Sequence, residues 1–355
     1  MNDLFKTKDI NGIIIGNFSN NSQAGMDKAI ILVDPYLRDL GINFSYISVK
    51  SIKNLVRSSI RFILKSPKKI DFVLFNALAS FWLYPYSTII AKFFGLLKIP
   101  VFIYWRELDM AFQYLEEKKP TAVNLLNKLV KEGNILHLTN SKITALFIKN
   151  RYPWIEPITV MNCAYVDDKL TINVKPSFDN PIITNSSSIQ YKKGIDLFIS
   201  TAIKVCKDHP TVEFIWMGSG KIEDELQRLI FEAGFSNRIL FPGFINKPEL
   251  VTRKANLVFI PSRQDSFSQA TAEAMCLAKN IVVFESGGPV EILDGTGFVI
   301  KNFDTEEAAK VILNLLAQSP ENSINNAARQ KYFDLYTPEV HAKRLSEVIR
   351  KHVRN

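Results

Sequence analysis

Short apolar runs alternate with longer amphipathic segments along the first half of the chain. The first amphipathic segment, residues 25–39, places Ala29, Leu32, Val33 and Leu37 at helical spacing. The apolar runs, which we predict to be strands, are residues 11–16, 43–49, 71–75, 100–105 and 134–139. Alternation of strands and helices at this interval predicts a parallel sheet that is covered by helices on both faces.

A second alternating series begins at residue 181 and fills most of the second half. Its predicted strands are residues 181–185, 212–218, 238–243, 256–260, 280–284 and 297–300. Between the two series, residues 166–180 are polar and weakly periodic, which is typical of a linker. The sequence therefore predicts an α/β protein with two domains, residues 1–165 and residues 181–336.

The composition fits a two-domain protein of a reducing compartment. The chain has 355 residues, of which 47% are hydrophobic, and this is enough for two packed cores. It has no apolar run of about 18 residues that could span a membrane, and its N-terminus does not have the pattern of a signal peptide. Cys163, Cys206 and Cys276 are far apart and odd in number, which does not suit a disulfide framework or a metal site. We therefore expect a cytoplasmic protein.

Positive charge is concentrated in the first half. Residues 1–170 hold 22 of the 44 Lys and Arg residues but only 14 of the 35 Asp and Glu residues. No acidic residue lies between Asp39 and Asp71, and residues 50–69 combine basic residues with helical apolar spacing. This segment predicts contact with an anionic membrane surface; an ordinary amphipathic helix on the sheet is the alternative. It lacks the interleaved aromatic residues of single-strand binders, so no nucleic-acid partner is expected.

The most informative segment is residues 261–291, PSRQDSFSQATAEAMCLAKNIVVFESGGPVE. Asp265 lies on a loop after one predicted strand, and Glu273 lies eight positions later on a predicted helix. A glycine-rich turn with Gly287 and Gly288 follows the next strand. Such loops, at the carboxyl ends of parallel strands, bind ligands in open α/β sheets. Carboxylates can accept sugar hydroxyls and these turns can hold phosphate, so the segment suits a nucleotide sugar.

This segment resembles the E-x7-E region of retaining glycosyltransferases of the GT-B fold, family 4. The family pattern is PSxxEGFxxxxxEAMxxGxPVV followed by GGxxE, which is residues 287–291 here. Asp265 occupies the first acidic position, and Ala278 stands where glycine is usual. The resemblance implies an α/β GT-B architecture: two Rossmann-like domains that face each other across a cleft, with a C-terminal helix in residues 337–355 that returns to the first domain.

The resemblance also implies roles for individual residues. In the element at residues 190–202, the family's KG-x-D-x-L, Lys193 is the lysine that reaches the donor diphosphate. Asp265, the other predicted catalytic residue, accepts hydroxyls of the donor sugar, and Glu273 accepts both ribose hydroxyls. The family's usual arginine before this lysine is replaced by serines at residues 186–188. Further implied substrate-binding positions are Gly16, Arg106, Glu107, Asn162, Gly243, Phe244, Ser268, Gln269, Ala270, Gly287 and Gly288.

The implied function is that of a retaining hexosyltransferase. It moves a sugar from a donor such as a UDP- or GDP-hexose to a glycan or lipid-linked acceptor, in cell-surface polysaccharide or glycolipid synthesis. No cofactor and no metal are expected, since Lys193 and helix N-termini can hold the phosphate charge. Contact with lipid would place the protein at the inner face of the plasma membrane.

Two alternatives to this function stay open. A GT-B-fold nucleotide-sugar epimerase would share the donor pocket but would need an acid and a base in the cleft. A catalytically weak glycosyltransferase-like partner subunit would account for the missing arginine. It would also account for Trp105-Arg106-Glu107, which replaces a histidine motif that is common after the fourth strand.

Overall fold

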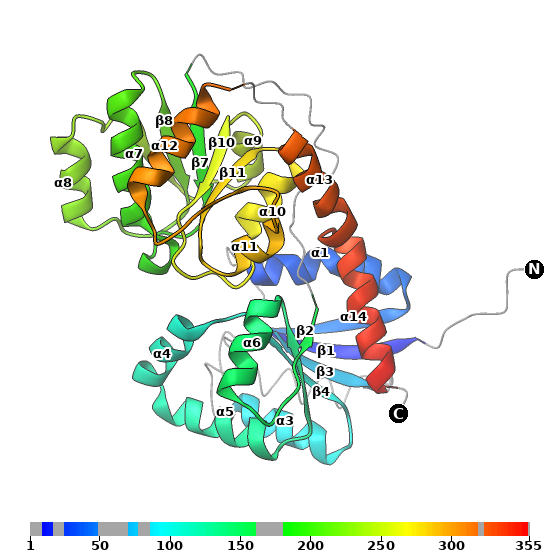
Figure 1. The fold of residues 1–355 in the computed structure, drawn as a ribbon. Coiled ribbons are helices and arrows are strands. Elements are labelled where there is room, and N and C mark those ends of the chain that lie inside the picture. The colour runs from blue at the N-terminus through cyan, green and yellow to red at the C-terminus, as the bar shows by residue number, and fades with distance from the viewer. Residues whose placement is uncertain are drawn as a thin grey trace, which may run out of the picture. The chain divides into compact units, whose positions relative to one another are not determined.

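The computed structural model describes residues 9–16, 25–48, 70–76, 86–160, 180–318 and 323–353. The chain divides into two compact units, which Figure 1 shows as ribbons. The first unit is Met1–Cys163 together with Thr337–Asn355, and the second is Ala164–Tyr336. The predicted basic segment at residues 50–69 and almost all of the predicted linker lie outside the described residues.

A six-stranded sheet forms the centre of the first unit. Its strand order is β2-β1-β3-β4-β5-β6, and every neighbouring pair is parallel. The strands are β1 (Ile10–Gly16), β2 (Ile42–Ser48), β3 (Phe72–Asn76), β4 (Val101–Trp105), β5 (Ile135–Thr139) and β6 (Ile158–Thr159). The described helices are α1 (Gly25–Asp39), α3 (Tyr86–Leu96), α4 (Asp109–Lys118), α5 (Pro120–Glu132), α6 (Lys142–Arg151) and α14 (Pro338–Val353).

The central strands of this sheet are apolar on both faces because helices cover both sides. All residues of β3 and of β4 are buried, as is usual for central parallel strands. Figure 1 shows α1 and α14 on one side of the sheet and α3 and α5 on the other. The buried residues of α5 recur at helical spacing: Ala122, Val123, Leu126, Leu129 and Val130.

The helix α14 packs in the first unit although it follows the second unit in the chain. It lies against α1, and Arg350 donates a hydrogen bond to the carbonyl of Leu40. The His341 ring stacks on Tyr104 of β4, with 6.3 Å between ring centroids. Residues from the C-terminal end thus complete the first unit.

The second unit has its own six-stranded parallel sheet, in the order β12-β11-β10-β7-β8-β9. The strands are β7 (Ile182–Ser186), β8 (Glu213–Met217), β9 (Ile239–Gly243), β10 (Leu257–Ile260), β11 (Asn280–Phe284) and β12 (Phe298–Ile300). Its helices are α7 (Ile195–Asp208), α8 (Asp224–Glu232), α9 (Pro248–Thr252), α10 (Gln269–Cys276), α11 (Gly288–Leu293), α12 (Thr305–Leu316) and α13 (Ser323–Leu335). A short 3₁₀ turn, η2 (Tyr191–Lys193), precedes α7.

The order of the strands shows where each sheet can bind a ligand. Numbered along the chain, the second sheet has the 3-2-1-4-5-6 order of dinucleotide-binding folds, whereas the first begins 2-1-3-4-5. In both types the ligand binds outside the carboxyl ends of the strands, at the point where the order reverses. In the second unit this switch point lies between β7 and β10, which pair directly. The loops that follow these two strands are therefore the expected binding loops.

Each strand that the sequence predicts is present, with ends that differ by at most one residue. The predicted helix at residues 25–39 is α1. The sequence does not predict β6, because its two residues are too few to show a period.

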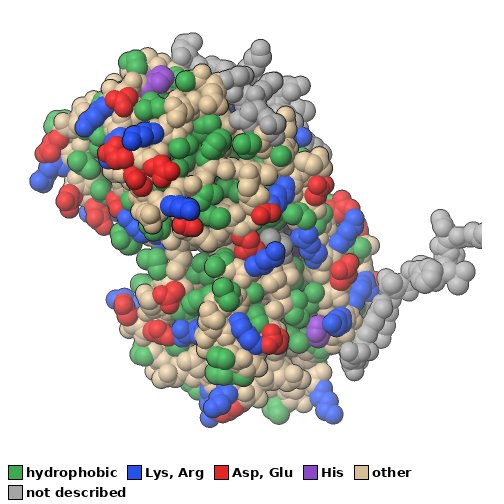
Figure 2. Space-filling model, in the orientation of Figure 1, with side chains coloured by type: hydrophobic (Ala, Val, Ile, Leu, Met, Phe, Trp, Pro, Cys, Tyr) green, Lys and Arg blue, Asp and Glu red, His purple; other side chains and the backbone are tan. Residues whose placement is uncertain are grey.

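The surface of the second unit carries both signs of charge. Figure 2 shows acidic and basic side chains interspersed over this unit. Lys204 pairs with Glu306, and Lys221 lies 3.6 Å from Asp224. Exposed pairs of this kind contribute about 0–1 kcal/mol each, so we assign them no role in holding the binding loops.

A buried histidine makes the stability of the first unit depend on pH. His137 lies on β5, where its Nδ1 accepts a hydrogen bond from the Trp105 indole at 3.0 Å. Burial lowers the pKa of His137 from 6.5 to about 4, so the folded protein holds it neutral. Below pH 6.5 the unfolded chain binds a proton that the folded chain does not, and stability falls as the pH falls from 6.5 towards 4.

We expect the wild type to lose about 2 kcal/mol more stability than His137→Gln between pH 7 and pH 5. Urea unfolding of both proteins at the two pH values measures this difference. Equal pH dependence of wild type and His137→Gln would contradict the assignment.

Candidate functional site

Two loops of the second unit meet at the switch point between β7 and β10. The first, residues 186–194, follows β7, and the second, residues 261–268, follows β10. The amides of Arg263 and Gln264 both donate to the carbonyl of Lys192, at 2.9 and 3.2 Å. The loops therefore lie against each other through their backbones.

This close approach requires glycine at position 194. Gly194 has a φ of +73°, and a Cβ there would lie 1.9 Å from the carbonyl oxygen of Pro261. No side chain fits at that distance, and few residues adopt that φ. Gly194 also begins α7, so the contact fixes the lysine-bearing turn against the second loop.

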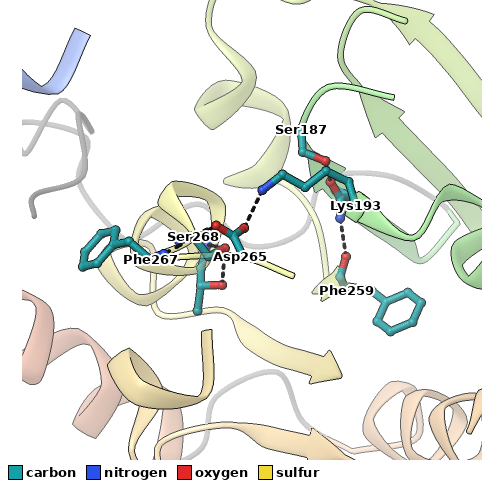
Figure 3. A network of polar contacts seen from close by, with 8 residues as sticks. Ser187, Lys193, Phe259, Asp265, Phe267 and Ser268 are labelled. Atoms are coloured by element: carbon teal, nitrogen blue, oxygen red, sulfur yellow. Dashed lines mark hydrogen bonds and ion pairs between the residues drawn. The ribbon is translucent and has the colours of Figure 1, made fainter. Parts of the chain in front are cut away.

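The two predicted catalytic residues lie in contact at this junction. Figure 3 shows the side chains of Lys193 and Asp265 pointing toward one another, from the first and the second loop. Lys193 Nζ donates to Asp265 Oδ2 at 2.6 Å. The side chains are 19% and 11% exposed, so both are shielded but accessible. The structure thus joins two residues to which the sequence gives separate roles.

Asp265 also fixes the start of the helix that follows. Its Oδ1 accepts from the amide of Ser268 at 3.1 Å. Ser268 has a φ of +69° and caps α10, with its Oγ accepting from the amide of Thr271 at 3.3 Å. Gln269 and Ala270 form the first turn, where backbone N–H groups have no partner within the helix. A carboxylate, an ammonium and a helix N-terminus therefore lie together at the switch point.

The glycine-rich turn after β11 packs on the Asp265 loop. The amide of Gly288 donates to the Asp265 carbonyl at 2.9 Å, and Gly287 pairs with Asp265 as an isolated parallel bridge. A Cβ on Gly288 would lie 2.5 Å from the amide nitrogen of Phe267. Gly287 has a φ of +89° and a ψ of −101°, which glycine tolerates best. The turn that the sequence assigns to phosphate binding thus also supports the Asp265 loop.

Glu273 lies on α10 and is 5% exposed. Carboxylates are seldom buried without a partner, and Glu273 does have polar interactions in the structure. Asp265 lies on the loop before α10 and helps to cap this helix, and Glu273 lies within the helix. One helix and the loop before it therefore carry both carboxylates. This placement suits a carboxylate that accepts paired hydroxyls.

The serine segment that replaces the family's arginine has a structural role of its own. Ser187 Oγ donates to Asn185 Oδ1 at 2.9 Å, and the Asn185 amide donates to the Phe259 carbonyl at 2.8 Å. Figure 3 shows Ser187 and Phe259 on the Lys193 side of the site. A Cβ on Gly218 would lie 1.8 Å from the carbonyl oxygen of Ser187. These contacts tie β7 to β10, but residues 186–188 supply no cation.

Gly243 and Phe244 lie at the carboxyl end of β9, the edge strand next to β8. Gly243 has a φ of +79°. Its carbonyl accepts from the amide of Gly218 at 2.9 Å. Phe244 is exposed. They therefore share the carboxyl edge of the sheet with the switch-point loops but come from its far strand.

The predicted residues of the first unit form a separate set. Gly16 ends β1, and Arg106 and Glu107 follow β4 directly. Arg106 is buried with its guanidinium 4.2 Å from the centroid of the Tyr104 ring. Its amide donates to Glu107 Oε2 at 3.0 Å. Asn162 lies outside the described residues.

The sequence does not single out Arg263 and Asp196, which join the two loops. The Arg263 guanidinium donates to both carboxylate oxygens of Asp196, at 2.7 and 2.5 Å. Burial raises the pKa of Asp196, but the hydrogen bonds and charge of Arg263 outweigh it and leave this pKa below its usual value. Asp196 is the aspartate of the KG-x-D pattern, and this pattern is the signal in the sequence that could have identified it.

Comparisons with known proteins bear on the family resemblance and on the fold. The profile of the family described as glycosyl transferases group 1 matches residues 168–331, nearly the whole second unit. Nearly half of the chain, within the second unit, thus resembles this family. Within the described residues, the chain has no helix long and apolar enough to cross a membrane.

Two curated relatives illustrate the range of the family. The chain is 27% identical over 157 residues to alpha-D-kanosaminyltransferase from Streptomyces kanamyceticus. The aligned region covers 42% of this chain and 40% of the relative. It is 28% identical over 138 residues to the lipopolysaccharide core biosynthesis mannosyltransferase LpcC of Rhizobium leguminosarum bv. viciae. Here the aligned region covers 36% of this chain and 39% of the relative. The chain thus spans less than half the length of these relatives.

Solved structures show the fold. The structure of Anabaena HepE in complex with UDP and glucose has a TM-score of 0.74 at 18% identity, covering 95% of this chain and 99% of HepE. WaaG, a glycosyltransferase involved in lipopolysaccharide biosynthesis, has a TM-score of 0.72 at 12% identity, covering 95% of this chain and 99% of WaaG. The fold of the chain is therefore GT-B, as the sequence predicts.

Proposed function

We propose that this protein transfers a hexose from a nucleotide-diphosphate sugar to a hydroxyl acceptor with retention of configuration. The observation that carries the proposal is the contact of Lys193 with Asp265 at the switch point between β7 and β10. A cation, a carboxylate and the N-terminus of α10 there offer partners for a diphosphate and for sugar hydroxyls. HepE, with a similar fold, was solved with UDP-glucose, which supports a donor of this class.

In the proposed reaction the bond between the sugar C1 and the diphosphate oxygen breaks. A bond from the acceptor oxygen to C1 forms on the same face of the sugar. The acceptor proton moves to the departing phosphate oxygen, so no side chain need act as base. Negative charge that develops on the leaving diphosphate is stabilised by Lys193 and by the backbone N–H groups of Gln269 and Ala270. The Ser268 amide, which the resemblance also assigns to the diphosphate, donates to Asp265 in the structure.

Two carboxylates would orient the donor. Glu273 accepts the ribose hydroxyls and Asp265 accepts sugar hydroxyls, which aligns C1 with the acceptor. The substrate-binding roles of Gly16, Arg106 and Glu107, in the first unit, stay predictions from the resemblance. We propose that this chemistry proceeds without a metal ion, since Lys193 and the helix N-terminus supply the positive charge.

A nucleotide screen tests this function. UDP, GDP and ADP, each with matching sugar donors, should be compared for the rise in melting temperature of the protein. One nucleoside diphosphate and its sugar should stabilise the protein with or without EDTA. Slow hydrolysis of that sugar donor should persist in EDTA. Stabilisation by none of these donors would overturn the proposed function, and activity that returns only with manganese would overturn the metal-free mechanism.

We further propose that the acceptor is a membrane-held glycan or lipid-linked sugar that the protein meets at an anionic surface. The basic segment at residues 50–69 is the sequence basis for this proposal. In the described structure, α3 and the turn after it add an apolar surface: Ile89, Phe93, Leu96 and Leu97 are all exposed, and Leu96 is 83% exposed. Lys92 and Lys98 accompany them, and no acidic residue occurs between Asp71 and Glu107. Exposed apolar side chains among lysines suit the interface of an anionic bilayer.

We expect Leu96→Gln/Leu97→Gln to weaken binding to phosphatidylglycerol vesicles about tenfold while nucleotide binding is unchanged. Vesicle flotation at low and high salt measures this, and high salt should weaken wild-type binding. Phe231→Gln is the matched control, because Phe231 is a 75% exposed apolar residue of the second unit. Absence of wild-type binding to these vesicles, or equal binding by all three proteins, would contradict the membrane proposal and leave a soluble acceptor.

A further inference from the structure

In addition to the backbone contacts, the side chain of Arg263 links the Asp265 loop to the Lys193 turn. Its guanidinium makes the paired contact with Asp196 described above and donates to the carbonyl of Tyr191 at 3.0 Å. It also lies 4.0 Å from the centroid of the Tyr191 ring, a favourable cation–π distance. Tyr191 precedes Lys193 in the chain and Asp196 follows it, so Arg263 contacts the turn on both sides of the lysine.

The paired contact with Asp196 also limits what else the Arg263 guanidinium can bind. Both oxygens of Asp196 face its guanidinium, and its remaining contacts are to Tyr191. The serines at residues 186–188 leave the donor site without the family's usual arginine, and Arg263 is the nearest arginine in sequence to Asp265. Both terminal nitrogens of Arg263 already donate to Asp196, whereas the Lys193 ammonium has three N–H donors and gives one of them to Asp265. Lys193 is then the side-chain cation that the two loops offer to the donor.

We infer that Arg263 is a positioning residue: through Asp196 and Tyr191 it holds Lys193 against Asp265, in the orientation that meets the departing phosphate. The inference rests on the proposed function for what Lys193 does, but the position of Lys193 can be measured without any donor. A bidentate arginine contact fixes both distance and direction, which a lysine at the same place cannot do. Loss of Arg263 should therefore loosen Lys193 while the rest of the second unit stays folded.

The first experiment measures the reactivity of Lys193 toward an amine-acylating reagent, followed by peptide mass spectrometry, in the ligand-free protein. In the wild type Lys193 Nζ is in contact with Asp265 and its side chain is only 19% exposed, so it should react slowly. Arg263→Gln should raise its rate about tenfold relative to Lys221, an exposed lysine of the same unit. Arg263→Lys should give an intermediate rate, because it keeps the charge but loses the paired geometry.

Arg238 provides a matched control in the same unit. Its guanidinium donates to the carbonyls of His209 and Cys206, both at 2.7 Å, and lies 4.6 Å from the centroid of the Phe235 ring. These contacts resemble those of Arg263 but do not involve the two switch-point loops. Arg238→Gln should lower the melting temperature and leave the Lys193 rate unchanged. An Arg263→Gln protein that behaves like Arg238→Gln would overturn the inference, since Arg263 would then be merely structural.

The second experiment is a double-mutant cycle with Asp196→Asn, read out by the dissociation constant of UDP or GDP, whichever stabilises the wild type. If Arg263 positions Lys193 through Asp196, both single variants should weaken binding by about the same factor, roughly tenfold, and the double variant no further. If Arg263 instead binds the diphosphate itself, Asp196→Asn would release its guanidinium and tighten binding. That result would overturn the inference.

Turnover separates the inference from the proposed function. With an active donor, Arg263→Gln should lower kcat about tenfold, because the orientation of Lys193 matters most when charge develops. The donor KM should also rise, as the weaker nucleotide binding requires. A loss confined to KM would contradict this. If no nucleotide sugar is turned over by the wild type, the proposed function fails, whereas the acylation rates still decide whether Arg263 positions Lys193.

Discussion

Lys193→Gln should lower kcat/KM for the nucleotide sugar by about 10²- to 10³-fold. The lysine lies at the junction of the two switch-point loops, 2.6 Å from Asp265. Removing one preoriented donor from a developing negative charge typically has an effect of this size. Steady-state kinetics at saturating acceptor measure it, together with the melting temperature of the variant.

Lys204→Gln is the control for this prediction. Lys204 also pairs with a carboxylate, that of Glu306, but on the surface of the same unit. Its removal should change stability by less than about 1 kcal/mol and leave kinetics unaltered. If Lys193→Gln kept its kcat/KM within about threefold of wild type, the Lys193–Asp265 contact would be a structural ion pair and the assigned site would be wrong.

The two carboxylates should affect different kinetic parameters. Glu273→Gln should raise KM and the nucleotide dissociation constant about 10- to 100-fold, since hydrogen bonds to a charged acceptor contribute about 1.5–3 kcal/mol. Asp265→Asn should instead lower kcat by at least about tenfold, because it orients the reacting sugar and pairs with Lys193. Asparagine keeps an oxygen for the Ser268 amide, so the cap of α10 should survive.

Isothermal titration with the bare nucleotide separates the two carboxylate roles. It reports on Glu273 and should change little in Asp265→Asn. Glu306→Gln, on the surface, should match the wild type in both assays. Exchange of the two effects, with nucleotide binding lost in Asp265→Asn and turnover lost in Glu273→Gln, would show that the roles are assigned the wrong way round.

The sequence predicts the strands well because each is a short apolar run between polar turns. The strands β3 and β4 are buried throughout, so their apolar runs are continuous and easy to locate. The pattern around Asp265 predicts the loop and helix that carry the site. The structure also explains why glycine is usual at position 278 of the pattern: Ala278 has a φ of +51°, a conformation that glycine adopts more readily.

The contacts across the site could not be predicted in the same way. Lys193 and Asp265 are 72 positions apart, and their contact follows from the pairing of β7 with β10. Arg263 and Asp196 look like ordinary surface charges in the sequence, because nothing local indicates that each is the other's partner. Periodicity describes which residues are buried within one element, whereas the partner of a polar side chain depends on the strand order of the whole sheet.

The position of α14 affects the order in which the two units can fold during synthesis. The second unit is continuous in sequence, from Ala164 to Tyr336, and can fold as soon as it leaves the ribosome. The first unit is synthesised earlier but lacks the contacts of His341 and Arg350 until these residues emerge, after the second unit. During synthesis the apolar side of α1 therefore stays uncovered while the whole second unit is added. The unit that is translated first is the one that is completed last.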